Sequence, residues 1–144
     1  MIGVYIHIPY CRTICPYCDF VKRPTKGAVP AEFIRALTTE IASFDGPREA
    51  DTVFFGGGTP SLIAPRDLET VLHAVRDRFS LTSDCELTLE ANPDDITEDI
   101  VRAWIDLGVN RVSLGVQSFN EDALRYLGRR HDADGARRTC AIVK

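Results

Sequence analysis

Three cysteines lie close together near the start of the chain. Cys11, Cys15 and Cys18 have the spacing C-x3-C-x2-C within one short segment. Thiolates at this spacing can surround a soft metal ion or an iron–sulfur cluster, and three of them leave one iron of a [4Fe–4S] cluster without a protein ligand. A small molecule can bind at that iron. The spacing therefore predicts a metal centre with one open position.

Two other interpretations of the three cysteines stay open from the spacing alone. Structural zinc takes four ligands, and the fourth would have to be His7, Cys85, Cys140 or His131, none of which has the usual spacing. The other interpretation is a set of unrelated thiols. A closed set of disulfides fits poorly, because three is an odd number and the first residues do not resemble a secretory leader. We expect Cys85 and Cys140 to be small buried hydrophobic residues.

The composition is that of one globular unit. Of the 144 residues, 44% are hydrophobic and 26% are charged, which is enough for one core but not for two full domains. The net charge of −4 gives no basic field for nucleic acid, so we expect no nucleic-acid partner. No apolar run reaches the ~20 residues of a transmembrane helix. We expect a cytoplasmic location, where thiols stay reduced.

Apolar patterns predict that strands and helices alternate along the chain. Strands are expected at 4–8, 51–55, 86–91 and 111–116, and helices are expected to begin near Pro30, Pro65, Thr97, Asn120 and Asp134. The first helix should end before Asp45-Gly46-Pro47, and its apolar face should comprise Phe33, Leu37, Ile41 and Phe44. Residues 21–29 indicate an exposed connection. Successive strand-then-helix units indicate an α/β fold with parallel strands.

Residues that could bind a ligand occur at the carboxyl end of each expected strand. The three cysteines follow the first strand, Gly56–Thr59 the second and Gln117 the fourth, and Glu90 lies at the end of the third. In parallel α/β folds, ligands bind at this end. Successive glycines let the backbone approach an anion closely, although a plain strand-to-helix turn also uses glycine. The shared location favours a single site.

These segments resemble a known superfamily. The cysteine spacing and Gly56-Gly57-Gly58-Thr59-Pro60 resemble the cluster loop and the glycine-rich segment of radical S-adenosylmethionine (SAM) proteins. Five segments are more narrowly similar to the oxygen-independent coproporphyrinogen III oxidases and their heme-chaperone relatives: Tyr5–Cys11, Gly56–Leu62, Leu89–Pro93, Gly115–Phe119 and Leu127–His131. The similarity runs from residue 4 to about residue 140. Asp19-Phe20 resembles the chaperone branch, because the oxidases have a further cysteine in place of Phe20.

The resemblance implies a fold and a set of bound groups. The fold would be a partial TIM-type barrel, with residues 1–144 as the N-terminal portion of a radical SAM core, truncated after about four strands, and the rest of the barrel and a C-terminal domain absent. Cys11, Cys15 and Cys18 would hold a [4Fe–4S] cluster, whose electron would cleave SAM to a 5′-deoxyadenosyl radical. The implied SAM contacts are Tyr5, Gly57, Gly58, Thr59, Glu90, Gln117 and Arg129.

The resemblance leaves three functions to distinguish, and it leaves open whether the chain is an enzyme. Asp19-Phe20 favours a heme chaperone that delivers heme to respiratory proteins. The alternatives are oxidative decarboxylation of coproporphyrinogen III in porphyrin biosynthesis, and an inactive fragment. The implied partners are heme or a porphyrinogen, a reductant protein such as flavodoxin or ferredoxin, and a heme-receiving respiratory protein. No heme ligand is assigned, because His7, His73 and His131 each have a sufficient structural explanation.

Overall fold

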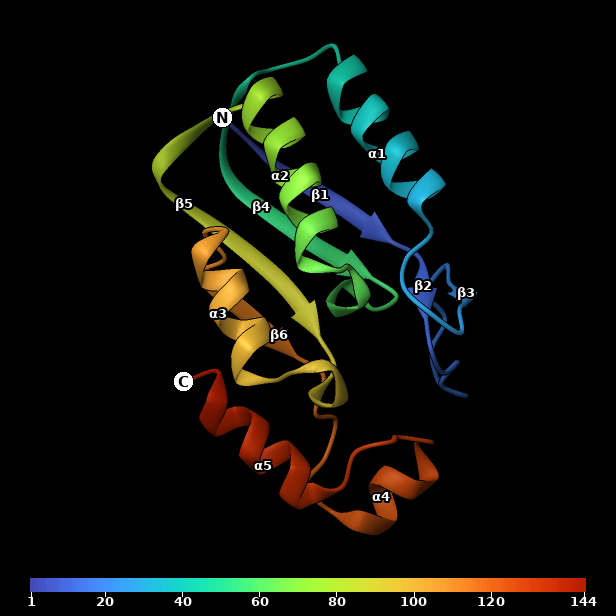
Figure 1. Cartoon of the computed structure of the whole chain (residues 1–144). Coiled ribbons are helices and arrows are strands. Elements are labelled where there is room, and N and C mark those ends of the chain that lie inside the picture. Colours follow the sequence, from blue (N-terminus) through green and yellow to red (C-terminus); the bar gives the residue numbers. More distant parts are fainter.

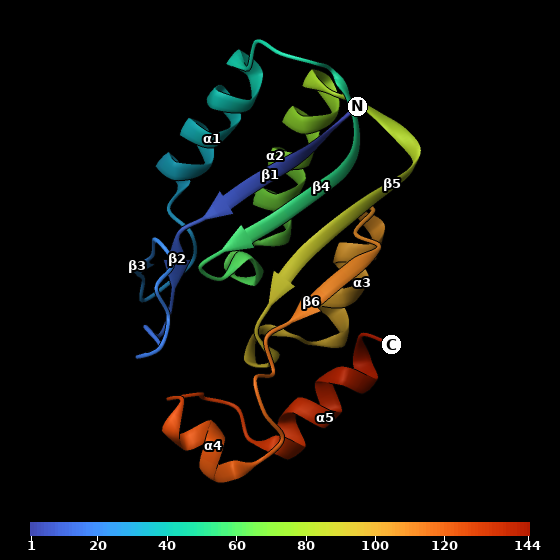
Figure 2. The same ribbon diagram turned by 180° about the vertical axis from the view of Figure 1, so that it is seen from behind.

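A four-stranded parallel sheet forms the centre of the computed structural model, which describes residues 1–144. The strands are β1 (Ile2–Ile8), β4 (Glu49–Gly57), β5 (Ser80–Ala91) and β6 (Arg111–Leu114). They lie in the order β1-β4-β5-β6, and each neighbouring pair is parallel. The arrowheads of β1, β4 and β5 therefore point toward the same end of the molecule (Figure 1), and Figure 2 shows β6 with the same direction. The prediction of an α/β fold with parallel strands is confirmed.

Three helices cover one face of this sheet. They are α1 (Ala31–Ser43), α2 (Pro65–Arg78) and α3 (Glu98–Asp106), and Figure 2 shows the strands in front of them when the molecule is viewed from behind. The main core lies between these two layers and includes Val53, Phe55 and Leu89, none of which is exposed. Two further helices, α4 (Glu121–Tyr126) and α5 (Ala133–Ile142), follow β6. None of the five helices has the length and apolarity needed to cross a membrane.

The strand boundaries differ from those expected. Strand β5 begins at Ser80, not near residue 86, because residues 80–81 pair with Glu49 and Ala50 before an irregularity in the ladder. Strand β6 ends at Leu114, two residues early, because its last partner, Ala91, is also the end of β5. Polar residues in 80–85 conceal the start of β5, whereas Val116 suggested a strand where no partner residue pairs; in both places the neighbouring strand sets the pairing.

A second, smaller sheet closes the base of the segment that carries the three cysteines, residues 11–22, which we call the cysteine loop. Strands β2 (Tyr10–Cys11) and β3 (Arg23–Pro24) pair in parallel, and the backbone N–H of Thr25 donates to the carbonyl of Cys11 at 2.9 Å. The sequence indicated only an exposed connection over residues 21–29. Two-residue strands that include a proline carry no periodic signal. The pairing holds the two ends of the loop side by side.

The helix caps agree closely with the sequence. Thr97 accepts a hydrogen bond from the backbone of Ile100, and Asn120 accepts one from Ala123, so both residues are N-caps and the helix starts expected there are confirmed. Gly108, just beyond α3, has a φ of 93°, which suits glycine after a helix. Helix α5 begins at Ala133, one residue before the expected start.

Phe44 is a correction. It was expected on the apolar face of the first helix, but α1 ends at Ser43 and Phe44 is 44% exposed. Its ring centroid lies 5.6 Å from that of Phe79, and the buried Arg78 guanidinium carbon lies 5.3 Å from it. Arg78 also donates to the Phe44 carbonyl at 2.6 Å. Arg78 therefore holds the turn after α1, and Phe44 does not continue the helix although its spacing fits the apolar face.

The outlying cysteines are also less buried than expected. Cys85 and Cys140 are both free and only partly buried. Cys85 lies in the part of β5 that does not pair with β4, which leaves one side of the strand open. Partial burial raises the pKa of its thiol, and the charges of Asp51, Asp84 and Glu86 raise it further.

The layered core yields a stability prediction for two adjacent residues of α3. The side chain of Trp104 is 1% exposed within the core, whereas Ile105 is 64% exposed. We expect Trp104→Ala to lower the free energy of unfolding by about 3–5 kcal/mol, because it leaves a large cavity. Ile105→Ala, the matched control, should change it by less than about 0.5 kcal/mol. Urea denaturation followed by circular dichroism measures both, and similar losses would contradict this packing.

Candidate functional site

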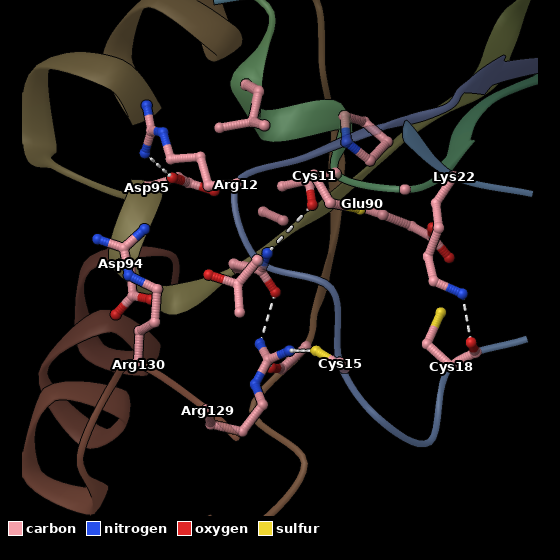
Figure 3. A pocket seen from close by; sticks show the side chains of 18 of the residues that line it. Cys11, Arg12, Cys15, Cys18, Lys22, Glu90, Asp94, Asp95, Arg129 and Arg130 are labelled. Carbon is pink, nitrogen blue, oxygen red and sulfur yellow. Dashed lines mark hydrogen bonds and ion pairs between the residues drawn. The ribbon is translucent and has the colours of Figure 1, made fainter. Parts of the chain in front are cut away.

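Nine of the ten predicted site residues line one cavity of about 320 Å³ at the carboxyl ends of the strands. The nine are Cys11, Cys15, Cys18, Gly57, Gly58, Thr59, Glu90, Gln117 and Arg129. They come from the segments that follow β1, β4 and β6 and from the end of β5, with Arg129 supplied from beyond α4. Parallel pairing thus brings together residues that are far apart in the sequence. Figure 3 shows the three cysteines, Glu90 and Arg129 around this cavity, which we call the thiol cavity.

The three thiols share the thiol cavity but differ in exposure. Cys11 is buried, whereas Cys15 and Cys18 are partly exposed. The pKa of Cys11 is raised, mainly because the thiol is buried. Negative charge on Cys18 or Cys15 also raises it, whereas a hydrogen bond with Thr59 and the Lys22 ammonium oppose the rise. No three His, Cys, Asp or Glu side chains in the structure are gathered closely enough to hold a metal ion. The thiols therefore suit a soft metal by their chemistry, but their side chains would have to converge to bind one.

Gly58 lies in the glycine-rich segment Gly56–Thr59, which we call the glycine loop, and it allows this segment to pack against the cysteine loop. Its N–H donates to the carbonyl of Ile8 at 2.8 Å, which joins the end of β4 to the end of β1. A Cβ at this position would lie 2.9 Å from the Cys11 sulfur and 2.8 Å from the Tyr10 carbonyl oxygen. A side chain would collide with these atoms, so glycine is required for the two loops to approach this closely.

Glu90 and Asn92 tie the end of β5 to the glycine loop. Gly57 has a φ of 110°, and its N–H donates to Glu90 Oε2 at 3.1 Å. The amide of Asn92 donates to the hydroxyl of the buried Thr59 at 3.3 Å. These two contacts fix the glycine loop relative to the neighbouring strand. They also leave the Glu90 carboxylate facing the thiol cavity.

Arg129 links the cysteine loop to the ends of β5 and β6. Its Nη1 lies 3.6 Å from the Cys15 sulfur (Figure 3). Its Nη2 donates to Asn92 Oδ1 at 2.5 Å and to the Gly115 carbonyl at 2.8 Å. Its Nε–H is buried and has no partner. A buried guanidinium N–H without an acceptor is costly. Arg129 therefore retains one donor available to an anionic ligand.

Gln117 occupies an unusual backbone conformation. Its φ of 68° makes it the one non-glycine residue in the chain with a positive φ, and its exposed side chain lines the thiol cavity. Such conformations are costly for residues other than glycine, and they cluster at functional sites. The backbone of Gln117 is therefore held in a conformation that costs free energy, which is typical of ligand-binding positions.

Tyr5 is the predicted residue that does not line the thiol cavity. It is 58% exposed, stacks on Phe54 at 6.0 Å between ring centroids, and shares a 3.0 Å hydrogen bond between its hydroxyl and Nδ1 of His7. Partial burial and then the charge of Glu90 raise the pKa of Tyr5. Tyr5 therefore lies on the sheet outside the cavity wall, where its hydroxyl is bonded to His7 and the charge of Glu90 affects its pKa.

The histidines make structural contacts, but His7 is only partly buried, where a buried residue was expected, and the buried Nδ1 of His131 has no hydrogen-bond partner. Nε2 of His7 lies 3.0 Å from the Val21 carbonyl, where the cysteine loop returns to the sheet. His131 is buried, and its Nε2 lies 2.9 Å from the Val116 carbonyl. His73 is exposed on α2. None of the three lines the thiol cavity.

Several polar residues of the thiol cavity escaped the sequence interpretation. Lys22 donates to the carbonyls of Cys18 and Phe20, and Arg12 pairs with Asp95. Single charges in an exposed loop or turn have no periodicity to distinguish them. Asn92 carried a usable signal, because it belongs to the segment Leu89–Pro93 on which the family resemblance rests.

The model of the radical SAM superfamily matches residues 5–144. The chain belongs to the radical SAM superfamily. The heme chaperone HemW of Escherichia coli strain K12 is 42% identical over 147 residues, which cover 99% of this chain and 39% of that protein. The mitochondrial radical S-adenosyl methionine domain-containing protein 1 of Bos taurus is 42% identical over 142 residues, which cover 96% of this chain and 32% of that protein.

A solved structure supports the same placement for this radical SAM chain. Coproporphyrinogen III oxidase (HemN) from Escherichia coli, described as a radical SAM enzyme, superposes with a TM-score of 0.88 at 28% identity. The match covers 98% of this chain and 33% of the oxidase. The fold thus corresponds to part of the radical SAM TIM-type barrel. The chain spans about two-fifths or less of the length of these relatives.

The close approach of Gly58 to Cys11 yields a prediction. We expect Gly58→Ala to lower the free energy of unfolding by about 1–3 kcal/mol, because the added methyl meets two backbone carbonyls that cannot move independently. Gly27→Ala is the matched control, since nothing lies within 4 Å of a Cβ there. Chemical denaturation compares the two variants. A Gly58→Ala protein as stable as the control would refute the close contact of the loops.

Proposed function

We propose that this chain binds a [4Fe–4S] cluster and SAM in the thiol cavity and acts in heme binding and delivery, as a heme chaperone. The observation that carries the proposal is the meeting of the three thiols with the glycine loop, Glu90, Gln117 and Arg129 around one cavity in a radical SAM chain. We expect this function in the cytoplasm, where exposed thiols stay reduced.

The cysteines would ligate three irons and leave the fourth to the amino and carboxylate groups of SAM. When bound, the cluster supplies the electron that cleaves SAM reductively. Cys11 would be the best-shielded ligand, because it is buried beneath Gly58, whereas Cys15 and Cys18 lie nearer to solvent. The Lys22 ammonium donates to the Cys18 carbonyl, and its charge lowers the pKa of Cys11.

The remaining side chains suit the polar parts of SAM. Arg129 Nε is a buried donor without an acceptor and would meet a carboxylate. The Glu90 carboxylate would accept hydrogen bonds from ribose hydroxyls, and the Gln117 amide can both donate and accept. Gly58 contributes close approach and not a donor, since its N–H is already bound to Ile8. We assign Tyr5 an indirect role, through its interaction with Glu90.

The segment after the last cluster cysteine supports the chaperone branch. Phe20 stands where the oxidases have a further cysteine, and it is 68% exposed. Heme chaperone relatives reach 42% identity, against 28% for the solved oxidase. The second candidate is decarboxylation of a porphyrinogen, and the TM-score of 0.88 with that oxidase favours it. Heme or a porphyrinogen, a reductant protein and a heme-receiving respiratory protein are the partners we propose.

Anaerobic reconstitution tests the cluster and SAM. We expect about four irons per chain, and a change in the electron paramagnetic resonance spectrum of the reduced protein when SAM is added. Cys11→Ala, Cys15→Ala and Cys18→Ala should each lose the cluster, because each removes one of the only three ligands. Cys140→Ala is the control and should retain it. Uptake of zinc alone, or equal loss in the control, would contradict the assignment.

A second assay separates the two candidate functions. The reconstituted chain is titrated with heme and then mixed with a heme-free acceptor such as apomyoglobin; in parallel it is incubated with coproporphyrinogen III, SAM and a reductant. We expect saturable heme binding and transfer by absorbance, and no decarboxylated product by mass spectrometry. Decarboxylation without heme binding would favour the oxidase.

A further inference from the structure

Asp95 lies where three loops of the thiol cavity meet. Arg12 follows β1 within the cysteine loop, Ser61 lies in the short 3-10 turn Pro60–Leu62 after β4, and Asp95 ends the turn Pro93–Asp95 after β5. Arg12 Nη1 lies 2.5 Å from Asp95 Oδ1 (Figure 3), and the Ser61 hydroxyl donates to Asp95 Oδ2 at 2.8 Å. One carboxylate therefore contacts both other loops, one through each oxygen.

Burial makes these contacts obligatory. The side chain of Asp95 is 6% exposed and Ser61 is 8% exposed, whereas Arg12 is 44% exposed. A buried carboxylate is unfavourable unless it is paired and hydrogen bonded. The hydroxyl of Ser61 also accepts from the backbone N–H of Asn92 at 3.3 Å, so the two turns are cross-linked. Moving the cysteine loop away would leave a buried charge without its cation.

The turn that carries Asp95 has support from behind. Thr139 of α5 is buried and donates to the Pro93 carbonyl at 3.3 Å. The cysteine loop is held at its base by the β2–β3 pairing and at Cys15 by Arg129, but between these points Arg12, Thr13 and Ile14 are exposed. The better-supported turn can therefore fix the position of the exposed loop through the ion pair.

We propose that Asp95 is a positioning residue that locks the cysteine loop, the glycine-loop turn and its own turn into one arrangement. It acts through Arg12 and Ser61 and does not touch the thiols. Arg12 is adjacent to Cys11 in the sequence, so holding the arginine restricts the backbone that presents the first thiol. The locking stands on the contacts of this chain alone. Its consequence for cluster retention rests on the function proposed above.

Hydrogen–deuterium exchange of the cluster-free chain tests the locking. We expect Asp95→Asn and Arg12→Gln each to accelerate exchange in peptides spanning residues 10–26 by about tenfold, since each removes a charge-assisted contact. Peptides from α2 should be unchanged. The double variant should resemble either single variant, because the two residues act as one pair. Arg12→Lys keeps the charge and should restore part of the protection.

Asp94→Asn is the matched control, because Asp94 adjoins Asp95 in the same turn but makes no side-chain hydrogen bond or ion pair. It should exchange like the parent chain. If Asp95→Asn left hydrogen–deuterium exchange in residues 10–26 unchanged, the proposal would be overturned. So would equal acceleration in every peptide, which would show that Asp95 supports only global stability.

Iron release tests the consequence for the cluster. After reconstitution, Asp95→Asn should lose iron to an added chelator about tenfold faster than the parent chain or Asp94→Asn, in step with its loop exchange. Loosened loops with unchanged iron release would overturn the consequence for the cluster. A parent chain that binds no cluster while Asp95→Asn still loosens the loop would refute the proposed function and leave the locking intact.

Discussion

Parallel pairing of four strands is the constraint on which the rest of this structure depends. In such a sheet every strand ends at the same edge, so the segments that follow the strands must lie beside one another. Helices α1, α2 and α3 return the chain along one face and bury the apolar side of β4 and β5. Backbone topology alone therefore brings together the cysteine loop, the glycine loop, Glu90 and Gln117, without requiring any contact between their side chains.

Polar contacts then set the exact relation between these neighbouring segments. Gly57 donates to Glu90, Asn92 to Thr59, and Arg129 to Asn92 and the Gly115 carbonyl. The first two join the ends of β4 and β5, and the contacts of Arg129 join the ends of β5 and β6. Partly buried hydrogen bonds of this kind are directional, and leaving one unmade is costly, so they resist the sliding that apolar packing alone would permit. These contacts join the segments that form the cavity walls to one another.

Membership in the radical SAM superfamily gives this geometry a chemical meaning. The donor set is soft and close to cationic side chains, which suits an iron–sulfur cluster. In the proposed function the protein would contribute little reactivity of its own: its thiols, glycines and polar groups would hold and orient the bound groups that carry the reaction. Gly58 illustrates this role, since the absence of a side chain is what allows the glycine loop to approach Cys11.

The sequence by itself determined the features that depend on neighbouring residues. Cysteine spacing, helix caps at Thr97 and Asn120, alternating strands and the glycine loop all arise from local backbone geometry and patterning, and they sufficed to predict the parallel fold. Only the tertiary structure decided which side chains face each other. Arg12 and Asp95 are 83 residues apart in the sequence, Tyr5 lies outside the cavity wall, and Arg78 holds Phe44 beyond its helix. Such contacts depend on how separate elements pack, and no local pattern records that packing.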